Sequence, residues 1–248
     1  MKIDFYYFGM QCPIIYETLS LLDQYKDMFH ISTYNVENDY ETAAKLKMFF
    51  PFLTVVNHNL RYRAPINKLF LEKLLHHEEI LEKPYVIPLS NNIFKGDIVP
   101  LTKSNIYLLA DKCTLNSSKV SCEKKGTFLS YHCDDILGFL NIKDSKVMGG
   151  VEFLPSQKVP YNIPKNKNYA FITCLYHSST EYDYKSEPLR ALENYLATKY
   201  STVFAITDEL GTFPNGNLDW FLKHGYKDEK IISVEDGYCI LHLVSKTL

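Results

Sequence analysis

Residues 78–105 interrupt the regular hydrophobic patterning of this 248-residue chain. The segment contains Pro84, Pro88 and Pro100, and it holds neither a helical nor a strand period for long. Proline restricts its own backbone and that of the preceding residue, so such segments mark loops and connections. A chain of this length holds one large domain or two ordinary ones. The break therefore predicts two domains, residues 1–78 and 106–248, joined by a linker over residues 79–105.

The first domain is predicted to contain strands and helices in the order strand, helix, strand, helix, strand, strand, helix. Short aromatic and β-branched runs predict strands, and apolar residues at helical spacing predict helices. The strands are expected at residues 3–8, 30–36, 52–56 and 60–63, and the helices at residues 15–28, 40–50 and 69–75. Pro51 ends the second helix, because proline cannot donate a backbone hydrogen bond.

The second domain is predicted to be a meander of strands followed by the order strand, helix, strand, helix, strand. Strands are expected at residues 106–110, 136–142, 147–154, 170–176, 203–207 and 238–244, and helices at residues 187–199 and 218–224. A hairpin turn is predicted from Lys143 to Lys146, and the last helix is predicted to end at Gly225. This order predicts an α/β (α+β) domain with a mixed, mostly antiparallel sheet and flanking helices.

The N-terminal domain resembles a thioredoxin-like domain over residues 2–77. Two features carry the likeness. The turn Gly9-Met10-Gln11-Cys12-Pro13 lies between the first strand and helix, where that family places its redox motif, and Pro51 precedes a strand at the position of the family's cis-proline. The resemblance implies redox chemistry centred on Cys12 and Pro51.

The chemistry of Cys12 follows from its expected position at the start of a helix. Backbone donors and the positive end of the helix dipole favour a thiolate there. The resolving thiol of a dithiol enzyme lies three residues further on, where this chain has Ile15. A one-cysteine mechanism with an external thiol is therefore one interpretation, and a buried, inert cysteine is the other.

The C-terminal domain resembles the GNAT acetyltransferase superfamily over about residues 106–245. The likeness is carried by Gly149-Gly150-Val151-Glu152-Phe153-Leu154, by Ala170 to Tyr176, by the helix that follows, and by Trp220-Phe221-Leu222-Lys223-His224-Gly225-Tyr226. Within that superfamily it is similar to the YoaP-like branch, through Glu152 to Pro155 and Pro160 to Pro164. The resemblance implies transfer of an acetyl group from acetyl-CoA to a small amine or a peptide.

The same resemblance implies where acetyl-CoA would bind. The pantetheine arm would lie along a strand edge that is splayed from its neighbour, and the pyrophosphate would lie at the start of the next helix. The implied binding residues are Thr173, Cys174, Leu175, Tyr176, His177, Lys185 and Arg190. The chain departs from the family at Thr180 to Lys185, which lacks the expected glycines and carries Glu181 and Asp183.

Acetyl transfer needs a base for the amine and a donor for the departing thiolate. Glu152 is the candidate base, Tyr184 a candidate donor, and Cys174 lies beside the expected groove. Each also has a structural interpretation: Glu152 as a hydrogen-bonded strand carboxylate, and Tyr184 and Cys174 as core residues. Phe221 stands where the family often has a tyrosine, so a binding or sensor protein without transfer activity is a second hypothesis.

Composition excludes other classes of function. The net charge of −2 argues against a nucleic-acid partner, since such proteins usually carry a basic excess. No apolar stretch reaches the roughly 20 residues that span a bilayer, and no signal peptide is expected. The six cysteines form no CxxC pair and no zinc spacing, so no metal is expected and a cytoplasmic location with reduced thiols is predicted. The oligomeric state is not predicted.

Overall fold

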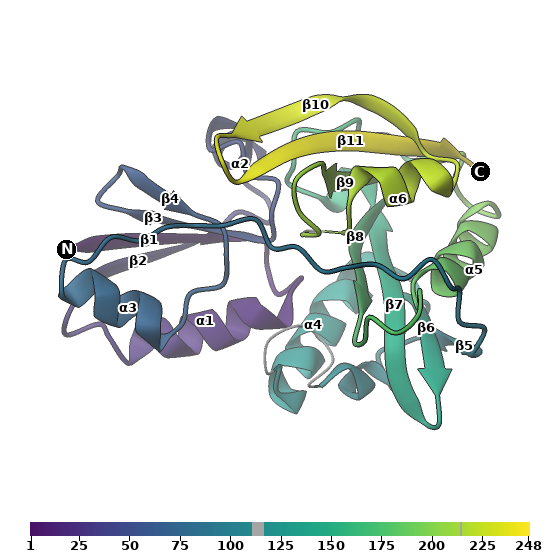
Figure 1. Cartoon of the computed structure of the whole chain (residues 1–248), viewed down its shortest axis with the longest axis horizontal. Helices are drawn as coiled ribbons and strands as arrows, with labels where there is room; N and C mark the ends of the chain where they lie inside the picture. The colour runs from purple at the N-terminus through teal and green to yellow at the C-terminus, as the bar shows by residue number, and fades with distance from the viewer. Residues whose placement is uncertain (111–116, 214) are drawn as a thin grey trace. The chain divides into compact units, whose positions relative to one another are not determined.

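The computed structural model describes residues 1–110, 117–213 and 215–248. The chain forms two compact units (Figure 1). The smaller unit comprises Met1–Lys83 with the short segment Pro160–Asn162, and the larger unit comprises Pro84–Val159 and Ile163–Leu248.

The smaller unit is built on a four-stranded sheet in the order β2-β1-β3-β4. β1 pairs in parallel with β2 and antiparallel with β3, and β3 pairs antiparallel with β4. The elements are β1 (Lys2–Tyr7), α1 (Pro13–Asp23), β2 (His30–Asn35), α2 (Tyr40–Lys45), β3 (Phe52–Val56), β4 (Leu60–Tyr62) and α3 (Lys68–Leu75).

Local sequence signals set most helix boundaries in this unit, but α2 ends at Lys45 and not at Pro51, where the sequence predicted its end. Pro13 is the first residue of α1, a position at which its missing N–H is not needed. The side chains of Asp39 and Asn67 accept hydrogen bonds from Thr42 N and Phe70 N, and so cap α2 and α3. All five residues of β3 are buried, which identifies it as a central strand.

The larger unit contains a seven-stranded sheet in the order β10-β11-β9-β8-β7-β6-β5. β8 and β9 pair in parallel, and the other neighbours pair antiparallel. The strands are β5 (Asp97–Leu101), β6 (Gly138–Lys143), β7 (Lys146–Pro155), β8 (Tyr169–His177), β9 (Thr202–Asp208), β10 (Lys227–Glu235) and β11 (Cys239–Thr247). The class is therefore mixed α/β with a mostly antiparallel sheet, as the sequence predicts.

Helices cover both faces of this sheet. Val151 and Phe153 of β7 share a core with Leu189 and Leu192 of α5 (Ser186–Leu196) and with Trp220 of α6 (Leu218–Lys223). Because side chains alternate along a strand, the residue between Val151 and Phe153 points to the other face. That face is covered by α4 (Lys119–His132).

Two predictions about this unit need correction, and the sequence analysis did not predict the helix α4. Residues 106–110 were expected to form a strand, but Ile106–Leu109 forms a 3-10 helix that packs against α4. The predicted linker contains β5, which pairs with β6 from Asp97↔Ile142 to Leu101↔Gly138. The sequence analysis also missed β10, whose residues are largely exposed because it is an edge strand with one neighbour. Its charged sequence hides the strand period.

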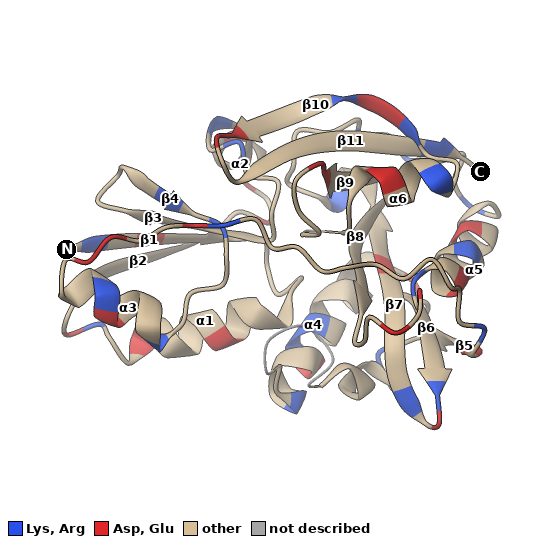
Figure 2. Ribbon diagram, viewed as in Figure 1, with Lys and Arg blue, Asp and Glu red and all other residues tan. Residues whose placement is uncertain are grey.

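Charge is distributed without a strong bias. Lys and Arg are interspersed with Asp and Glu on the elements of each unit (Figure 2). Within the described residues, no helix has the length and apolar character to cross a membrane.

Candidate functional site

The middle of the larger sheet opens where β8 and β9 part. In the described residues their parallel register runs from Tyr169↔Thr202 to Phe171↔Phe204 and ends there. Both strands continue, β8 to His177 and β9 to Asp208. Beyond this point the two strands, as far as the structure describes them, no longer pair with each other, and the end of β9 is met instead by residues 215–217, where Asp208 N donates to Gly216 O at 3.3 Å.

Asn215 bridges the two strands at the start of this opening. Its Nδ2 donates hydrogen bonds to Ile206 O at 2.9 Å and to Ile172 O at 3.5 Å. The side chain is 1% exposed, and its Oδ1 is buried with no hydrogen-bond partner among the described residues. The amide thus replaces part of the missing strand pairing.

A β-bulge in β8 accompanies the opening. Glu152 of β7 is opposite Cys174, but Phe153 is opposite Ile172, so Thr173 is the extra residue. Residues directly opposite each other share a face of the sheet. Glu152 and Cys174 therefore both face α4, whereas Ile172 belongs to the core beneath α5.

Glu152 forms a buried ion pair on that face. Its carboxylate lies 2.6 Å (Oε2) and 2.8 Å (Oε1) from Lys125 Nζ of α4, and the glutamate has no exposed surface. Burial raises the pKa of Glu152, and the charge of Lys125 opposes that shift. A role as base would require this pair to open.

Tyr184 lies on the opposite face from Glu152. A Cβ added to Gly149 would meet Tyr184 O at 2.5 Å and Tyr184 Cβ at 2.9 Å, so glycine is needed for this contact. Tyr184 is fully buried beside the Phe94 ring at 5.2 Å. The structure therefore brings Glu152 and Cys174 to one face and keeps Tyr184 on the other.

The loop between β8 and α5 is held by an upstream segment. Phe94 N donates to Asp183 O at 3.1 Å, and Asp183 N donates to Asn92 O at 2.8 Å. This pairing places residues 92–94, predicted as part of the linker, alongside the loop that the family resemblance assigns to pyrophosphate.

The carboxylate of Asp183 occupies the start of α5. Oδ1 accepts hydrogen bonds from Lys185 N at 2.8 Å and Ser186 N at 3.0 Å, and Oδ2 accepts from Ser186 Oγ at 2.5 Å and from Trp220 Nε1 at 2.9 Å. Burial alone would raise the pKa of Asp183, but the hydrogen bonds outweigh burial and lower it. Asp183 is therefore an ionised internal anion at a helix N-terminus.

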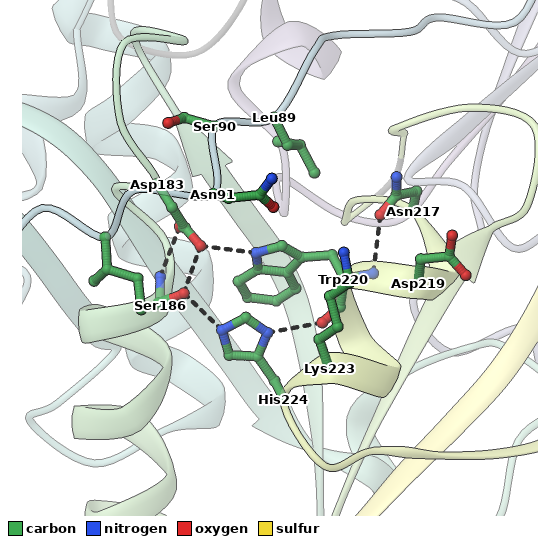
Figure 3. A pocket seen from close by; sticks show the side chains of 11 residues that line it. Leu89, Ser90, Asn91, Asp183, Ser186, Asn217, Asp219, Trp220, Lys223 and His224 are labelled. Carbon is green, nitrogen blue, oxygen red and sulfur yellow. Dashed lines mark hydrogen bonds between the residues drawn. The ribbon is translucent and has the colours of Figure 1, made fainter.

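A pocket of about 400 Å³ lies beside this carboxylate (Figure 3). The Nε2 of His224 lies 2.6 Å from Ser186 Oγ, and its Nδ1 lies 2.7 Å from Trp220 O. Both acidic and basic side chains line the pocket, together with Trp220 and residues of the 89–93 segment: Leu89, Ser90, Asn91, Ile93, Asp183, Ser186, Asn217, Asp219, Trp220, Lys223 and His224.

Lys185 and His224 both pack against the Trp220 indole. The imidazole of His224 stacks on the ring with centroids 3.9 Å apart, and Lys185 Nζ lies 4.3 Å from the ring centroid. Lys185 is 2% exposed, and burial lowers its pKa to about 8, although Asp183 opposes the shift.

The remaining predicted binding residues make contacts of their own. Arg190 is exposed and pairs with Glu187 one turn earlier on α5. His177, at the end of β8, has its Nδ1 2.7 Å from Ser179 O, and burial is the main cause that lowers its pKa. Thr173, Cys174, Leu175 and Tyr176 follow one another along β8, beyond the last residue paired to β9.

In the smaller unit, Cys12 is the N-cap residue of α1 and is 7% exposed. Phe8 N donates to Pro51 O at 2.9 Å, which ties the end of β1 to the residue before β3. Ile15, three residues further along α1, is fully buried. No cluster of potential metal ligands occurs in the described residues.

Sequence reasoning missed Lys125, Ser186, Trp220 and His224 as partners in these networks. One signal was available for Asp183, because an aspartate just before a helix is a common N-terminal capping residue. No sequence period shows that Lys125 pairs with Glu152, 27 residues away.

Comparisons with known proteins describe what the chain is similar to. No family model matches, and a search of curated proteins finds no match. Similar solved structures include an aminoglycoside 6'-acetyltransferase type Ii (15% identity, TM-score 0.46, covering 61% of this chain and 96% of that chain). They also include the aminoglycoside 6'-N-acetyltransferase from Enterococcus faecium (14% identity, TM-score 0.45, covering 61% of this chain and 96% of that chain). A third is the PaiA N-acetyltransferase from Thermoplasma acidophilum in complex with coenzyme A (14% identity, TM-score 0.44, covering 62% of this chain and 100% of that chain).

Proposed function

We propose that the larger unit is a GNAT-type N-acetyltransferase domain that binds the pantetheine arm of an acyl-CoA-type thioester and acts on a small amine or a peptide. The observation that carries this proposal is the parting of β8 and β9 after Phe171 and Phe204. The bulge at Thr173 lies in the parted section of β8.

A pantetheine arm could bind beside β8 in the way that an added strand pairs with a sheet edge. A pantetheine arm is extended and carries two amide groups, and a strand edge offers donors and acceptors at matching intervals. The proposed arm-binding residues are Thr173, Cys174, Leu175, Tyr176 and His177. The YoaP-like branch stays a proposal from sequence, based on Glu152 to Pro155 and Pro160 to Pro164.

In the proposed transfer, the amine nitrogen attacks the thioester carbonyl carbon. A carbon–nitrogen bond forms, the carbon–sulfur bond breaks, and a base takes the amine proton while the sulfur leaves as a thiolate. Glu152 is the proposed base and Cys174 lies on its face of the sheet. Tyr184, on the other face, is proposed only as a donor to the departing sulfur.

Binding without transfer is the second candidate. Two observations favour it: the Glu152 carboxylate is paired with Lys125 at 2.6 Å, and Asp183 occupies the start of α5. A domain with these features can hold a thioester while lacking an available base.

Turnover separates these candidates. The full chain is titrated with acetyl-CoA and with S-acetyl-pantetheine while its melting temperature is recorded, and free thiol is then measured after a panel of amines is added. Stabilisation with amine-dependent thiol release, lost in Glu152→Gln, supports the transferase. Stabilisation without release supports the binding protein. Absence of stabilisation by either ligand at millimolar concentration overturns both.

We further propose that the smaller unit is a thioredoxin-like domain. Its strand order β2-β1-β3-β4, with a parallel first pair, supports this, as do the positions of Cys12 and Pro51. With Ile15 in place of a second cysteine, the proposed chemistry is a one-cysteine exchange with an external thiol. Alkylation of Cys12 against pH, with Cys12→Ser as control, tests it: a thiol pKa near the ordinary value of about 8.5 leaves no activated nucleophile.

A further inference from the structure

The start of α5 already holds an anion that belongs to the chain. Helix N-termini bind phosphate groups because their first N–H groups have no partner within the helix. Here Lys185 N and Ser186 N donate to Asp183 Oδ1 at 2.8 and 3.0 Å. Two of the donors at the start of α5 are therefore taken, and Pro188 in the first turn has no N–H to offer.

Asp183 is also held from the side of α6. Its Oδ2 accepts from Trp220 Nε1 at 2.9 Å and from Ser186 Oγ at 2.5 Å. Asp183 is 8% exposed, so moving it aside would leave several buried donors without partners. The carboxylate is therefore a permanent part of the site rather than a mobile side chain.

The charge around this carboxylate opposes a second anion. Glu181 precedes Asp183 by two residues. Lys223 supplies positive charge on the α6 side. The ammonium of Lys185 is buried against the Trp220 ring, 4.3 Å from its centroid. Because Asp183 is 8% exposed, it would repel a second anion placed beside it more strongly than it would in water.

We propose that the larger unit selects thioesters whose pantetheine arm ends before a nucleotide diphosphate, and that Asp183 excludes acyl-CoA by occupying the anion site at the start of α5. This selection rests on the proposed function, because it concerns the ligand of the opening between β8 and β9. It makes Asp183 a specificity-determining residue.

Calorimetric titration of the full chain with S-acetyl-pantetheine and with acetyl-CoA tests the selection. The expected result is that acetyl-pantetheine binds tighter by about tenfold or more. Inorganic pyrophosphate at millimolar concentration is expected not to displace it. Equal or tighter binding of acetyl-CoA overturns the selection and leaves the proposed function standing. If neither thioester binds, the proposed function fails and the selection fails with it.

Two matched variants test whether Asp183 causes the selection against acetyl-CoA. Asp183→Asn removes the charge with little change of shape, and it is expected to narrow the preference by raising acetyl-CoA affinity about tenfold. Asp219→Asn makes the same charge change in the same pocket, away from the α5 amides, and is expected to leave the preference largely unchanged. The assignment to Asp183 is overturned if Asp183→Asn keeps the wild-type preference for acetyl-pantetheine over acetyl-CoA. It is also overturned if Asp219→Asn changes that preference more than Asp183→Asn does. Because the wild-type comparison needs no variant, the selection is tested even if Asp183→Asn does not fold.

Discussion

The indole Nε1 of Trp220 donates a hydrogen bond to Asp183 Oδ2 at 2.9 Å, across 37 residues of sequence. This bond joins α6 to the loop that precedes α5. The same ring stacks on the His224 imidazole and lies 4.3 Å from the Lys185 ammonium. The geometry of the pocket therefore depends on one aromatic residue and one carboxylate.

Replacing Trp220 by Phe tests the energy of this bond. The ring is retained in part, but the donor to Asp183 is lost, and we expect the free energy of unfolding to fall by about 1–3 kcal/mol. Urea denaturation measures the change. In an Asp183→Asn background the same substitution should cost less, because the charged partner is already gone. Equal losses in both backgrounds would attribute the effect to packing alone.

Replacing Lys185 by Met tests the buried ammonium. The pKa is about 8 in the folded chain against an ordinary value of 10.5, so at pH 7 both states hold the proton and the burial penalty is fully present. Between pH 8 and 10.5 the unfolded chain binds the proton more strongly, and wild-type stability should rise with pH.

Lys185→Met should therefore be more stable than wild type at pH 7, by an amount on the order of 3 kcal/mol. Its stability should also not rise between pH 8 and 10.5 as that of wild type does. Unfolding curves at several pH values decide this. Lys223→Met, on the exposed side of α6, is the control and should keep the rise. A wild-type stability that is flat over this range would contradict the expectation.

Removing one charged partner of the Lys125–Glu152 ion pair should destabilise the fold more than removing both partners. Lys125→Met leaves a buried carboxylate without its cation, and we expect a loss of about 3–5 kcal/mol. The double variant Lys125→Met, Glu152→Leu should recover much of that loss, since two apolar side chains replace the two charges. Thermal unfolding measures both variants and wild type, and a double variant no more stable than Lys125→Met would refute the expected coupling.

Gly149 and Gly150 are adjacent but should tolerate alanine differently. At Gly149 a Cβ meets the backbone oxygen of Tyr184 at 2.5 Å, which cannot easily move. At Gly150 it meets the Tyr176 hydroxyl at 2.5 Å, at the far end of a flexible side chain. Gly149→Ala should therefore lower the free energy of unfolding by about 1–3 kcal/mol, and Gly150→Ala by less. The opposite order in denaturation midpoints would show that the loop before α5 yields more readily than the tyrosine.

Local sequence determined much of the fold. The five buried residues of β3 and the turn at residues 143–146 follow from short patterns, because strand and helix periods depend on backbone geometry within a few residues. The amphipathic α5 and the bend at Gly225 are of the same kind. These elements were predicted within a few residues of their observed bounds.

Tertiary structure decided which side chains meet. β5 is a strand because β6 lies beside it, and Ile106–Leu109 becomes a 3-10 helix because it packs against α4. The pairing of Glu152 with Lys125, and the capture of the α5 amides by Asp183 under Trp220, join residues from different elements. A hydrogen bond needs two groups within about 3 Å, and sequence periodicity sets the direction of each side chain without setting the distance between distant ones.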